Sequence, residues 1–515
     1  MLVMIKASVI GRPRLLPVGL NAIKKPSYGL YVASYNGLTQ DFSMESRPRR
    51  RIHGSSNRSS PPTESYPVAS TPSVGSFPVE APTESSPRAK SAPLSVLPLP
   101  TVLRTLATTT ISSSPILLPP SLAVMSILAH SDHFLFNPDK NPLLRWFLKK
   151  TFYAQFCAGE NAVEVRRTVD GLKQIGFTGV IMGYAKEVVL SKSQERDLSS
   201  CGEGSDAEEC IRNEIIPWAN GTLETVRLAQ PGDFVALKFS GAGRQALYAL
   251  KNRLPPSKYL TSIIDEICNL AAERDVPLLF DAEQTTIQAG IDDWTMHYQR
   301  KYNTTPGHAI VYGTYQAYLK STPATLASHL ATATKENFTL GVKLVRGAYL
   351  GSDPRHIIYD TKADTDAAYD GIAASLIQRQ WGTFLQHPGD VAFPRVSILL
   401  GSHNIESVRK ARALRDSGVS ADTELAIAQL QGMADEVSCE LLCASKQGDG
   451  YVAKGKEAPK AYKYIVWGTT KECMKYLLRR AHENRDAVAR TKSGRDAAWS
   501  ELRRRARSVF GLAGA

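Results

Sequence analysis

The sequence has few cysteines, and none of them forms a pattern typical of a disulfide framework or a zinc site. Seven cysteines are spread over 515 residues. The closest two, Cys439 and Cys443, have no further thiol or imidazole nearby at zinc-ligand spacing. The odd number and the wide spacing favour a protein without structural disulfides, in a reducing or neutral compartment. We therefore predict no metal site.

Long apolar runs are also missing. No uninterrupted run reaches the roughly 18 residues that a membrane-spanning helix needs. The apolar stretch at residues 116–129 is shorter and contains Pro119 and Pro120. We expect this stretch to pack on the protein, and contact with a membrane face is the alternative.

Acidic residues are absent from the first 40 residues, where basic residues alternate with apolar ones. This composition is typical of a mitochondrial presequence, which we place at residues 1–45. Arg12, Pro13 and Arg14 interrupt the apolar run that a secretory signal would need. Up to residue 130 the chain has 13 Lys and Arg against 5 Asp and Glu, so this part carries +8 of the net charge of +13. The basic run at residues 49–51 would suit a nucleic acid, but the excess charge belongs to the tail, and we expect no nucleic-acid partner.

Composition divides the rest of the chain. Residues 46–130 are rich in Ser, Pro and Thr, and such a segment buries too little apolar surface to offset chain entropy. We predict that it is disordered. Residues 131–495 form the predicted catalytic domain, and residues 496–515 form a basic tail. Hydrophobic residues make up 43% of the chain, which is enough for a substantial core.

Short apolar runs recur eight times in the body, and each is followed by residues with helical apolar spacing. The runs lie at residues 179–182, 235–238, 277–280, 309–312, 342–345, 396–399, 425–428 and 464–466. A repeat of roughly 40 residues matches the βα unit of a (β/α)8 barrel. An open doubly wound sheet is the alternative. The count of eight favours an α/β fold of the TIM-barrel type with a disordered N-terminal extension. The acidic insertion at residues 191–210 is predicted to be a surface loop.

Polar side chains follow these runs, where a barrel places its chemistry at the C-terminal ends of the strands. They include Lys238, Asp281, Gln316, Arg346, Ser402, His403 and Asn404. In the last unit Arg479 and Arg480 are adjacent, and two guanidinium groups can bind a small carboxylate bidentately. Glu483 is spaced to hold both arginines in place. Taken alone, this pattern also fits an exposed basic helix face.

Together these segments resemble the proline dehydrogenase family, most closely its eukaryotic mitochondrial branch. The resemblance covers roughly residues 145–490 and rests on Cys157-Ala-Gly159-Glu160, Lys238, Asp281-Ala-Glu283, Gln316-Ala-Tyr318, Lys343-Leu-Val-Arg346-Gly347-Ala348-Tyr349, Ser402-His403-Asn404, Leu430-x-Gly432-Met433, Tyr464 and Arg479-Arg480-x-x-Glu483-Asn484. It implies a distorted (β/α)8 barrel and non-covalently bound FAD. It also implies oxidation of L-proline to Δ1-pyrroline-5-carboxylate, with hydride passing from proline C5 to flavin N5 and electrons then passing to a membrane quinone. Peripheral association with the matrix side of the inner mitochondrial membrane is a further expectation.

The resemblance also implies roles for individual residues. Lys238, Arg479 and Arg480, supported by Glu483, would hold the proline carboxylate. Tyr349, Leu430 and Tyr464 would pack on the pyrrolidine ring, and Asp281 would orient the site beside the flavin. The implied catalytic set is Lys238, Asp281, Tyr464, Arg479 and Arg480. The implied FAD-binding set is Asp281, Gln316, Lys343, Arg346, Gly347, Ala348, Ser402, His403 and Asn404.

Four other interpretations remain. Gly241-x-Gly243-x-x-Ala246 follows a strand and opens a helix, as in a dinucleotide-binding fingerprint. Lys238 and Lys343 lie on predicted barrel strands and could form a Schiff base, as in a class I aldolase-like lyase. A non-enzymatic interaction protein is the third possibility. A hydroxyproline-preferring relative is the fourth, although Tyr464 leaves little space for an added hydroxyl group.

Overall fold

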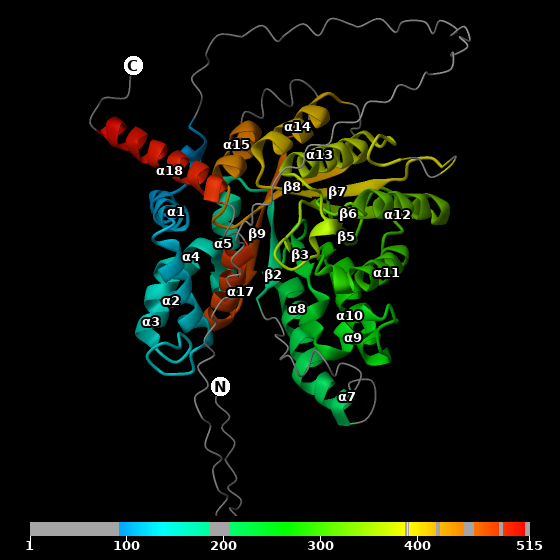
Figure 1. The fold of residues 1–515 in the computed structure, drawn as a ribbon, viewed down its shortest axis with the longest axis horizontal. Helices are drawn as coiled ribbons and strands as arrows, with labels where there is room; N and C mark the ends of the chain where they lie inside the picture. The colour runs from blue at the N-terminus through cyan, green and yellow to red at the C-terminus, as the bar shows by residue number, and fades with distance from the viewer. Residues whose placement is uncertain are drawn as a thin grey trace, which may run out of the picture. The chain divides into compact units, whose positions relative to one another are not determined.

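A computed structural model describes residues 92–185, 205–386, 389, 391–418, 423–446, 458–483 and 488–509. The chain divides into two compact units, Met1–Glu84 and Ser85–Ala515. All the described residues belong to the second unit (Figure 1). The predicted presequence at residues 1–45 lies outside the described part.

Eight parallel strands form a closed barrel. They are β2 (Gly179–Tyr184), β3 (Phe234–Leu237), β4 (Leu278–Phe280), β5 (Val311–Gln316), β6 (Leu340–Val345), β7 (Val396–Gly401), β8 (Glu424–Leu430) and β9 (Lys460–Trp467). Each strand pairs with the next along the chain, and β9 pairs with both β8 and β2, which closes the ring. A short strand, β1 (Cys157–Gly159), adds to the end of β9. The predicted TIM-type barrel is confirmed, every predicted run overlaps one of its strands, and the open doubly wound sheet is wrong.

Side chains alternate between the barrel interior and the helical layer, as the pleat requires. In β2, Ile181 packs inside the barrel with Leu279 and Leu399. Its neighbours Val180 and Met182 belong to the larger core between strands and helices. Burial on both sides explains why the strands appear in the sequence as nearly continuous apolar runs.

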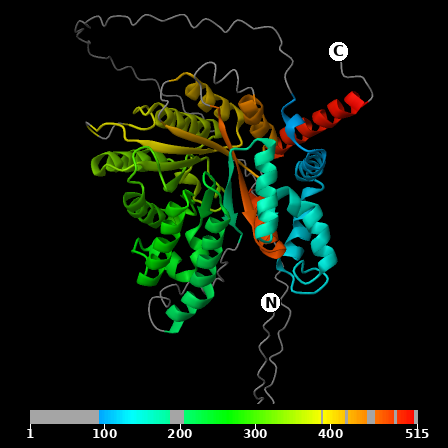
Figure 2. The ribbon, with the colours of Figure 1, turned by 180° about the vertical axis from the view of Figure 1, so that it is seen from behind.

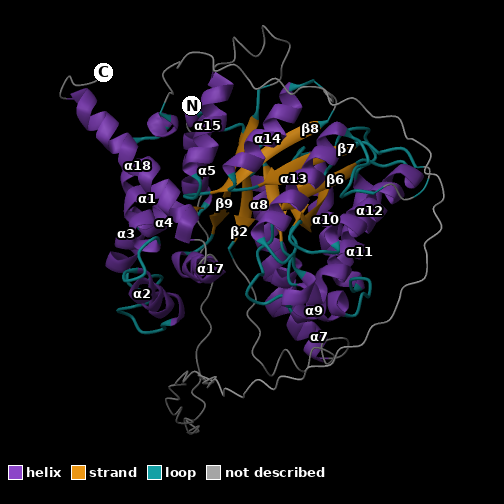
Figure 3. Ribbon diagram, turned by 45° about the horizontal axis from the view of Figure 1, so that its top comes forward, coloured by secondary structure: helices purple, strands orange, loops and turns teal. Residues whose placement is uncertain are grey.

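Helices surround the strands (Figure 3). They are α5 (Ala162–Ile175), α8 (Ile216–Leu228), α9 (Arg244–Lys251), α10 (Lys258–Glu273), α11 (Thr285–Tyr302), α12 (Thr322–Glu336), α13 (Lys362–Gln378), α14 (Ile405–Asp416), α15 (Asp435–Lys446) and α17 (Thr470–Glu483). Of the predicted surface loop, residues 205–210 instead form helix α7 (Ser205–Cys210), followed by a π-helical turn, Ile211–Ile215. The rest of that loop is not among the described residues.

The segment before the barrel is helical, so the predicted disorder of residues 46–130 is wrong for residues 92–130. This segment forms a 3-10 turn, η1 (Pro93–Val96), and then α1 (Leu99–Ser112) and α2 (Leu118–His130). They lead into α3 (Pro142–Lys150) and α4 (Phe152–Phe156). Val102 of α1 is fully buried, in a cluster with Leu94 and Leu97. These apolar positions are few within a segment rich in Ser, Pro and Thr, and their cluster is completed by Cys439 and Ala498 from distant parts of the chain.

The predicted basic tail also differs from expectation, because most of it lies in helix α18 (Val488–Val509). α18 lies beside α1 in Figures 1 and 2, and its Ala498 is buried in the cluster that contains Val102. Arg505 Nη2 donates to the carbonyl oxygen of Leu97 at 2.7 Å. The carboxylate of Glu501, 1% exposed, pairs with Arg504 and Arg505. The folded unit therefore extends beyond residues 131–495 at both ends.

Helix α2 packs on α17. Leu122 and Ala129 of α2 share a buried cluster with Met474 and Leu478 of α17. The expectation that residues 116–129 pack on the protein is therefore correct for one side of α2.

Candidate active site

The polar residues predicted at the rim lie at the C-terminal end of the barrel. Lys238, Asp281 and Arg346 directly follow β3, β4 and β6, and Gln316 is the last residue of β5. Tyr464 lies within β9 instead, where it pairs with Ile181 of β2 and with Leu430, the last residue of β8. Because all the strands are parallel, their C-terminal ends lie at the same end of the barrel, and these side chains are brought together there.

An ion pair and a hydrogen bond join three of the predicted residues inside this end of the barrel. Lys343 of β6 pairs with Asp281, and each side chain is 9% exposed. The hydroxyl of Tyr464 donates to the other carboxylate oxygen of Asp281 at 3.3 Å. Lys343 Nζ lies 5.5 Å from the centre of the Tyr464 ring. Two donors on one buried carboxylate fix its orientation, so Asp281 sets the positions of both partners.

Tyr349 shows that charges from several strands and from α17 converge here. Burial raises the pKa of Tyr349 to about 12, and the charges of Glu283 and Asp281 act in the same direction. The positive charges of Lys238 and Arg480 oppose this rise in pKa. Tyr349 therefore remains a neutral phenol at physiological pH, and two members of the predicted carboxylate clamp lie within electrostatic range of it.

A small cavity of about 30 Å³ lies where β2, β3 and β9 meet α17. Lys238, Tyr464, Trp218 and Tyr476 help to line it. Tyr476 belongs to α17, and the guanidinium carbon of Arg480 lies 5.6 Å from the centre of its ring. The cavity thus connects the residues at the strand ends with the helix that carries the two arginines. Glu483 is predicted to hold Arg479 and Arg480 in place, but its side chain lies outside the described part of the structure.

Glu160 has a role that the sequence did not reveal, although it stands in one of the recognised motifs. Its Oε1 accepts hydrogen bonds from the backbone N of Thr470 at 2.9 Å and from Thr470 Oγ1 at 2.6 Å. Its Oε2 accepts from Lys149 Nζ of α3 at 2.8 Å. Burial alone would raise the pKa of Glu160, but the bonds from Lys149 and Thr470 outweigh burial and lower it. Glu160 therefore fixes the first residue of α17, and no pattern within the sequence links residues 310 positions apart.

Gln316 and Gly347 join the loops after neighbouring strands. Gln316 Nε2 donates to the carbonyl oxygen of Glu283 at 3.3 Å, and its Oε1 accepts from the backbone N of Ala348 at 3.2 Å. Gly347 has a φ of +151°, and a Cβ there would come within 2.5 Å of the Tyr318 ring. Only glycine fits this position, which brings the backbone of the loop close to its neighbours.

Arg346 points toward the helices behind β6 and β7. Its Nη2 donates to Ser407 Oγ at 2.7 Å, its Nη1 lies 3.1 Å from Asp366 Oδ1, and its guanidinium lies 4.5 Å from the centre of the Tyr369 ring. The buried Nε of Arg346 has no hydrogen-bond acceptor among the described residues. A phosphate or flavin oxygen would supply one.

The three residues after β7 make contacts that shape the rim. Asn404 Oδ1 accepts from the backbone N of Glu406 at 3.0 Å and so caps the start of α14. Ser402 Oγ accepts from the backbone N of Asn404 at 3.1 Å. His403 Nε2 accepts from the backbone N of Leu430 at 3.1 Å. The bond from Leu430 to His403 ties the ends of β7 and β8 together. The amide nitrogen of Asn404 is a donor that a ligand could use.

The predicted FAD-binding residues are compatible with an anionic dinucleotide. The charges of Lys343 and Asp281 cancel in their ion pair, so this set opposes an anion with no unpaired carboxylate. Arg346, which also pairs with Asp366, and the amide groups of Gln316 and Asn404 come from the ends of β5, β6 and β7 or the loops directly after them. Among the described residues no group of three or more His, Cys, Asp or Glu is placed to hold a metal ion.

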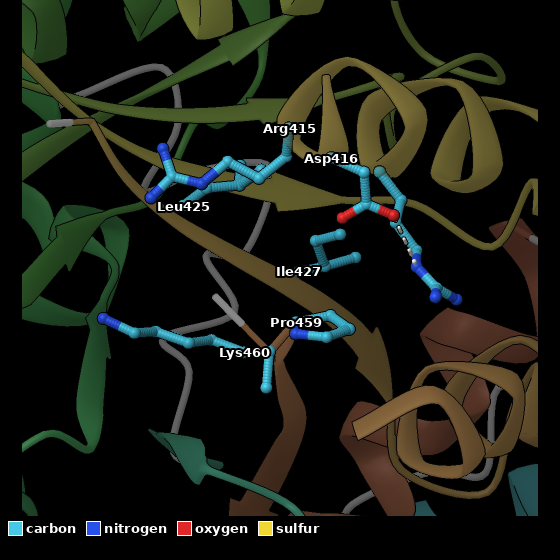
Figure 4. Close-up of a pocket in the computed structure, with 8 residues that line it drawn as sticks. Arg415, Asp416, Leu425, Ile427, Pro459 and Lys460 are labelled. Carbon is cyan, nitrogen blue, oxygen red and sulfur yellow. Dashed lines mark ion pairs between the residues drawn. The ribbon is translucent and has the colours of Figure 1, made fainter. Parts of the chain in front are cut away.

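A second small cavity lies at the opposite end of the barrel (Figure 4). Leu425 and Ile427 of β8 line it together with Lys460, the first residue of β9. Arg412 and Asp416 of α14 form an ion pair of 3.6 Å at its edge. It lies at the N-terminal ends of the strands, where barrels use residues for stability, so we assign it no part in the site.

The closed barrel and the charged cluster at the C-terminal ends of its strands define a barrel-type enzyme. The family model "Proline dehydrogenase" matches residues 165–493, well over half of the sequence. The chain belongs to the proline dehydrogenase family.

Several curated relatives carry mitochondrial names. The chain is 30% identical over 419 residues to the probable mitochondrial proline dehydrogenase of Schizosaccharomyces pombe, covering 72% of this chain and 81% of the relative. It is 28% identical over 356 residues to the mitochondrial proline dehydrogenase 1 of Drosophila melanogaster, covering 64% of this chain and 48% of the relative. It is 27% identical over 392 residues to the hydroxyproline dehydrogenase of Bos taurus, covering 70% of this chain and 81% of the relative.

Among solved structures, the chain is similar to proline utilization A from Bdellovibrio bacteriovorus inactivated by N-propargylglycine. The TM-score is 0.53 at 17% identity, covering 74% of this chain and 38% of that one. This similarity supports the fold alone. The chain spans about half of the Drosophila relative and well under half of the bacterial protein.

Proposed function

We propose that this protein is a mitochondrial proline dehydrogenase that oxidises L-proline to Δ1-pyrroline-5-carboxylate. Its cofactor is FAD, and its electron acceptor is a quinone in the inner membrane, reached from the matrix side. The proposal rests on membership of this family together with the Asp281–Lys343 ion pair beside Tyr464 and the positive charges of Lys238 and Arg480 within electrostatic range of Tyr349. The mitochondrial names of several relatives support the location.

The cationic side chains suit the carboxylate of proline. Lys238 follows β3 and lines the cavity, while Arg479 and Arg480 come from α17, whose Tyr476 lines the same cavity. Tyr349, Leu430 and Tyr464 supply apolar surface for the pyrrolidine ring. Holding the carboxylate end of a small rigid substrate leaves its C5 atom at one position, which is the main contribution that binding makes to such a reaction.

The reaction removes a hydride from C5 and a proton from the ring nitrogen, leaving a C5=N double bond. The amine must lose its proton for the nitrogen lone pair to assist, and nearby cations favour the neutral amine. Bound FAD supplies the two-electron acceptor. Gln316, Lys343, Arg346, Gly347, Ala348, Ser402, His403 and Asn404 are the residues proposed to hold it. Asp281 keeps Lys343 and Tyr464 in place beside the substrate.

Two of the alternative enzyme classes are less compatible with this geometry. A Schiff-base lyase needs a lysine amine that is available to attack a carbonyl group, whereas Lys343 is engaged in an ion pair with Asp281. For Lys238 the test is borohydride trapping. The dinucleotide-binding fingerprint around Gly241 and Gly243 belongs to open sheets, whereas these glycines follow a strand of a closed barrel.

Trans-4-hydroxyproline is a second candidate substrate, because the bovine relative is named hydroxyproline dehydrogenase. The Tyr464 ring, fixed by Asp281 and Lys343, favours proline. An added hydroxyl group would meet this ring without an assured hydrogen-bond partner.

The decisive experiment is the absorption spectrum of the purified full-length protein, before and after anaerobic addition of L-proline. We expect a flavin spectrum that bleaches with proline and recovers when a quinone analogue is added. Protein that gains no flavin spectrum after incubation with FAD would contradict the cofactor. A flavin that proline does not bleach would contradict the substrate. Borohydride trapping of substrate on the protein would instead favour a Schiff base.

A further inference from the structure

Exposed apolar side chains are concentrated in one short part of the chain. Of the 19 large apolar side chains that are exposed in the described residues, 10 lie between residues 116 and 147. Eight of these ten belong to three neighbouring elements: α2, the loop at residues 134–136, and α3, and the other two, Ile116 and Leu117, directly precede α2. A concentration of this size in a folded protein marks a surface that binds an apolar partner.

Helix α2 is apolar on two opposite sides. Leu122 and Ala129 face α17. Val124 and Ile127 are 55% and 52% exposed, and the helical repeat of 100° per residue places them on the opposite side. Before its last residue, His130, α2 contains no charged residue. Helices that are apolar all round are normally buried or in contact with lipid.

Helix α3 repeats this arrangement. Leu143, Trp146 and Phe147 are 73%, 60% and 55% exposed, and their i, i+3, i+4 spacing places them on one side of the helix. Leu148 of the same helix is buried in the cluster that contains Met474 of α17. The loop between the helices adds Phe-Leu-Phe at residues 134–136, all of them exposed. Figures 1 and 2 show α2, α3 and their connecting loop at the edge of the described unit, on the far side of α17 from the barrel.

The charges around these side chains favour an anionic partner. Lys140, Arg145 and Lys150 lie in or next to α3, among its exposed aromatic residues. The two acidic residues of this region are turned to α17: Asp132 pairs with Lys471 Nζ at 2.7 Å, and Asp139 accepts from the backbone N of Lys471 at 3.1 Å. Exposed Trp and Phe flanked by Lys and Arg are typical of segments that lie in the interface of an anionic bilayer.

The elements fit a bilayer surface better than a span. None of the described helices is long and apolar enough to cross a membrane. α2 has 13 residues, a length of about 20 Å, whereas the hydrocarbon core is about 30 Å thick.

We propose that the exposed sides of α2 and α3, with residues 134–136, form a surface that docks in the plane of an anionic phospholipid bilayer. We refer to it as the docking surface. This inference deepens the membrane association that accompanies the proposed quinone acceptor, but it rests on exposure and charge and does not depend on the reaction. The inner sides of the same helices pack on α17, so docking places the helix that carries Arg479 and Arg480 next to the bilayer, at the usual helix-to-helix separation of about 10 Å.

The test is flotation of the full-length protein with phosphatidylcholine vesicles, with and without cardiolipin. We expect binding to the vesicles that contain cardiolipin. The double variant Trp146→Glu, Phe147→Glu should reduce the bound fraction by at least about tenfold, because each large apolar side chain kept out of the bilayer forfeits about a tenfold gain in partitioning. The matched control is Trp499→Glu in α18, which changes a 46% exposed tryptophan outside the docking surface and should bind as the unaltered protein does.

A second measurement does not depend on the double variant folding normally. Vesicles with brominated acyl chains should quench the fluorescence of the unaltered protein, and Trp146→Phe should remove most of that quenching. Absence of binding to anionic vesicles, equal binding to neutral ones, or quenching that persists in Trp146→Phe would each overturn the proposal. So would sedimentation showing that the double variant abolishes self-association and leaves vesicle binding intact, because a second copy would then cover this surface. Proline oxidation with a soluble dye acceptor, measured on the same samples, reports separately on the proposed function.

Discussion

Replacing Glu160 by Gln tests whether the start of α17 governs how the protein holds its substrate. Glu160 lies between β1 and α5 and does not line the cavity, but it binds Thr470 at the first residue of α17 and Lys149 in α3. Gln keeps the shape of the side chain and one carbonyl acceptor for Thr470. It removes the negative charge that pairs with Lys149 and faces the helix N-terminus.

The cost can be estimated from the contacts. The ion pair with Lys149, in which the two side chains are 25% and 17% exposed, contributes up to about 1 kcal/mol. A negative charge at a helix N-terminus contributes about 0.3–1 kcal/mol. Glu160→Gln should therefore lower the free energy of unfolding by about 1–2 kcal/mol. Glu160→Ala also leaves Thr470 N without its acceptor and should lower it by about 3 kcal/mol. Both substitutions loosen the first turn of α17, the helix that carries Arg479 and Arg480. We therefore expect KM for proline to rise about threefold to tenfold, with kcat changed less than twofold.

The assay combines urea unfolding with steady-state kinetics on a soluble acceptor. Glu164→Gln is the matched control, because Glu164 also pairs with Lys149, while its other carboxylate oxygen accepts from the backbone N of Glu160 and not from α17. It should lose similar stability while KM stays unchanged. Because the pKa of Glu160 is lowered in the folded protein, its stabilising effect is complete above the ordinary glutamate pKa. The difference between Glu and Gln at position 160 should vanish as pH falls through the lowered pKa. Equal KM values for the two variants, or a change in kcat alone, would refute a positioning role for Glu160.

Three further substitutions test the site and the core. Arg480→Met should weaken proline binding by about 2–5 kcal/mol and so raise KM, while the flavin spectrum is retained. Lys475→Met, on the same helix, should leave KM unchanged. An unchanged KM in a folded Arg480→Met variant would remove Arg480 from the carboxylate clamp. Tyr464→Ser should narrow a preference for proline over trans-4-hydroxyproline of about 10- to 100-fold in kcat/KM, mostly by harming proline, and equal use of the two substrates by the unaltered protein would contradict the role of Tyr464. Burial lowers the pKa of His329 to about 4. The stability contributed by neutral His329 is therefore complete above the ordinary histidine pKa and is lost as pH falls toward about 4. The loss should reach about 2 kcal/mol by about pH 5. His329→Gln should therefore lose less stability than the unaltered protein between about pH 7 and pH 5 in urea unfolding, and parallel losses would show that His329 does not titrate in this way.

The barrel could be predicted from the sequence because its strands are buried on both sides, and each therefore appears as a short run of apolar residues. The run at residues 342–345 lies wholly within β6, and Arg346 follows the strand as expected. The last strand was harder to delimit, because the run at residues 464–466 covers only part of β9.

The features that the sequence did not predict depend on distant contacts. Val102 lies in a segment that its Ser, Pro and Thr content predicts to be disordered. Its burial depends on packing with Ala498, about 400 residues later in the chain. Glu160 gains its role only when Thr470 is brought to it by the pairing of β1 with β9. Arg346 follows its predicted strand, but its contacts with Ser407 and Asp366 depend on how α13 and α14 pack.

The contact between α1 and α18 has a consequence for how the chain reaches its final form. Arg505 binds the carbonyl oxygen of Leu97, 408 positions earlier in the chain, and Ala498 of α18 shares a buried cluster with Val102 of α1. During synthesis, Val102 and Leu97 emerge long before Ala498 exists to bury them. Contacts between such distant segments form late, because closing a long loop precedes any stabilising gain. The two ends of this unit therefore join after the barrel strands between them have been made, and the apolar side of α1 stays open to other partners until the last residues of α18 arrive.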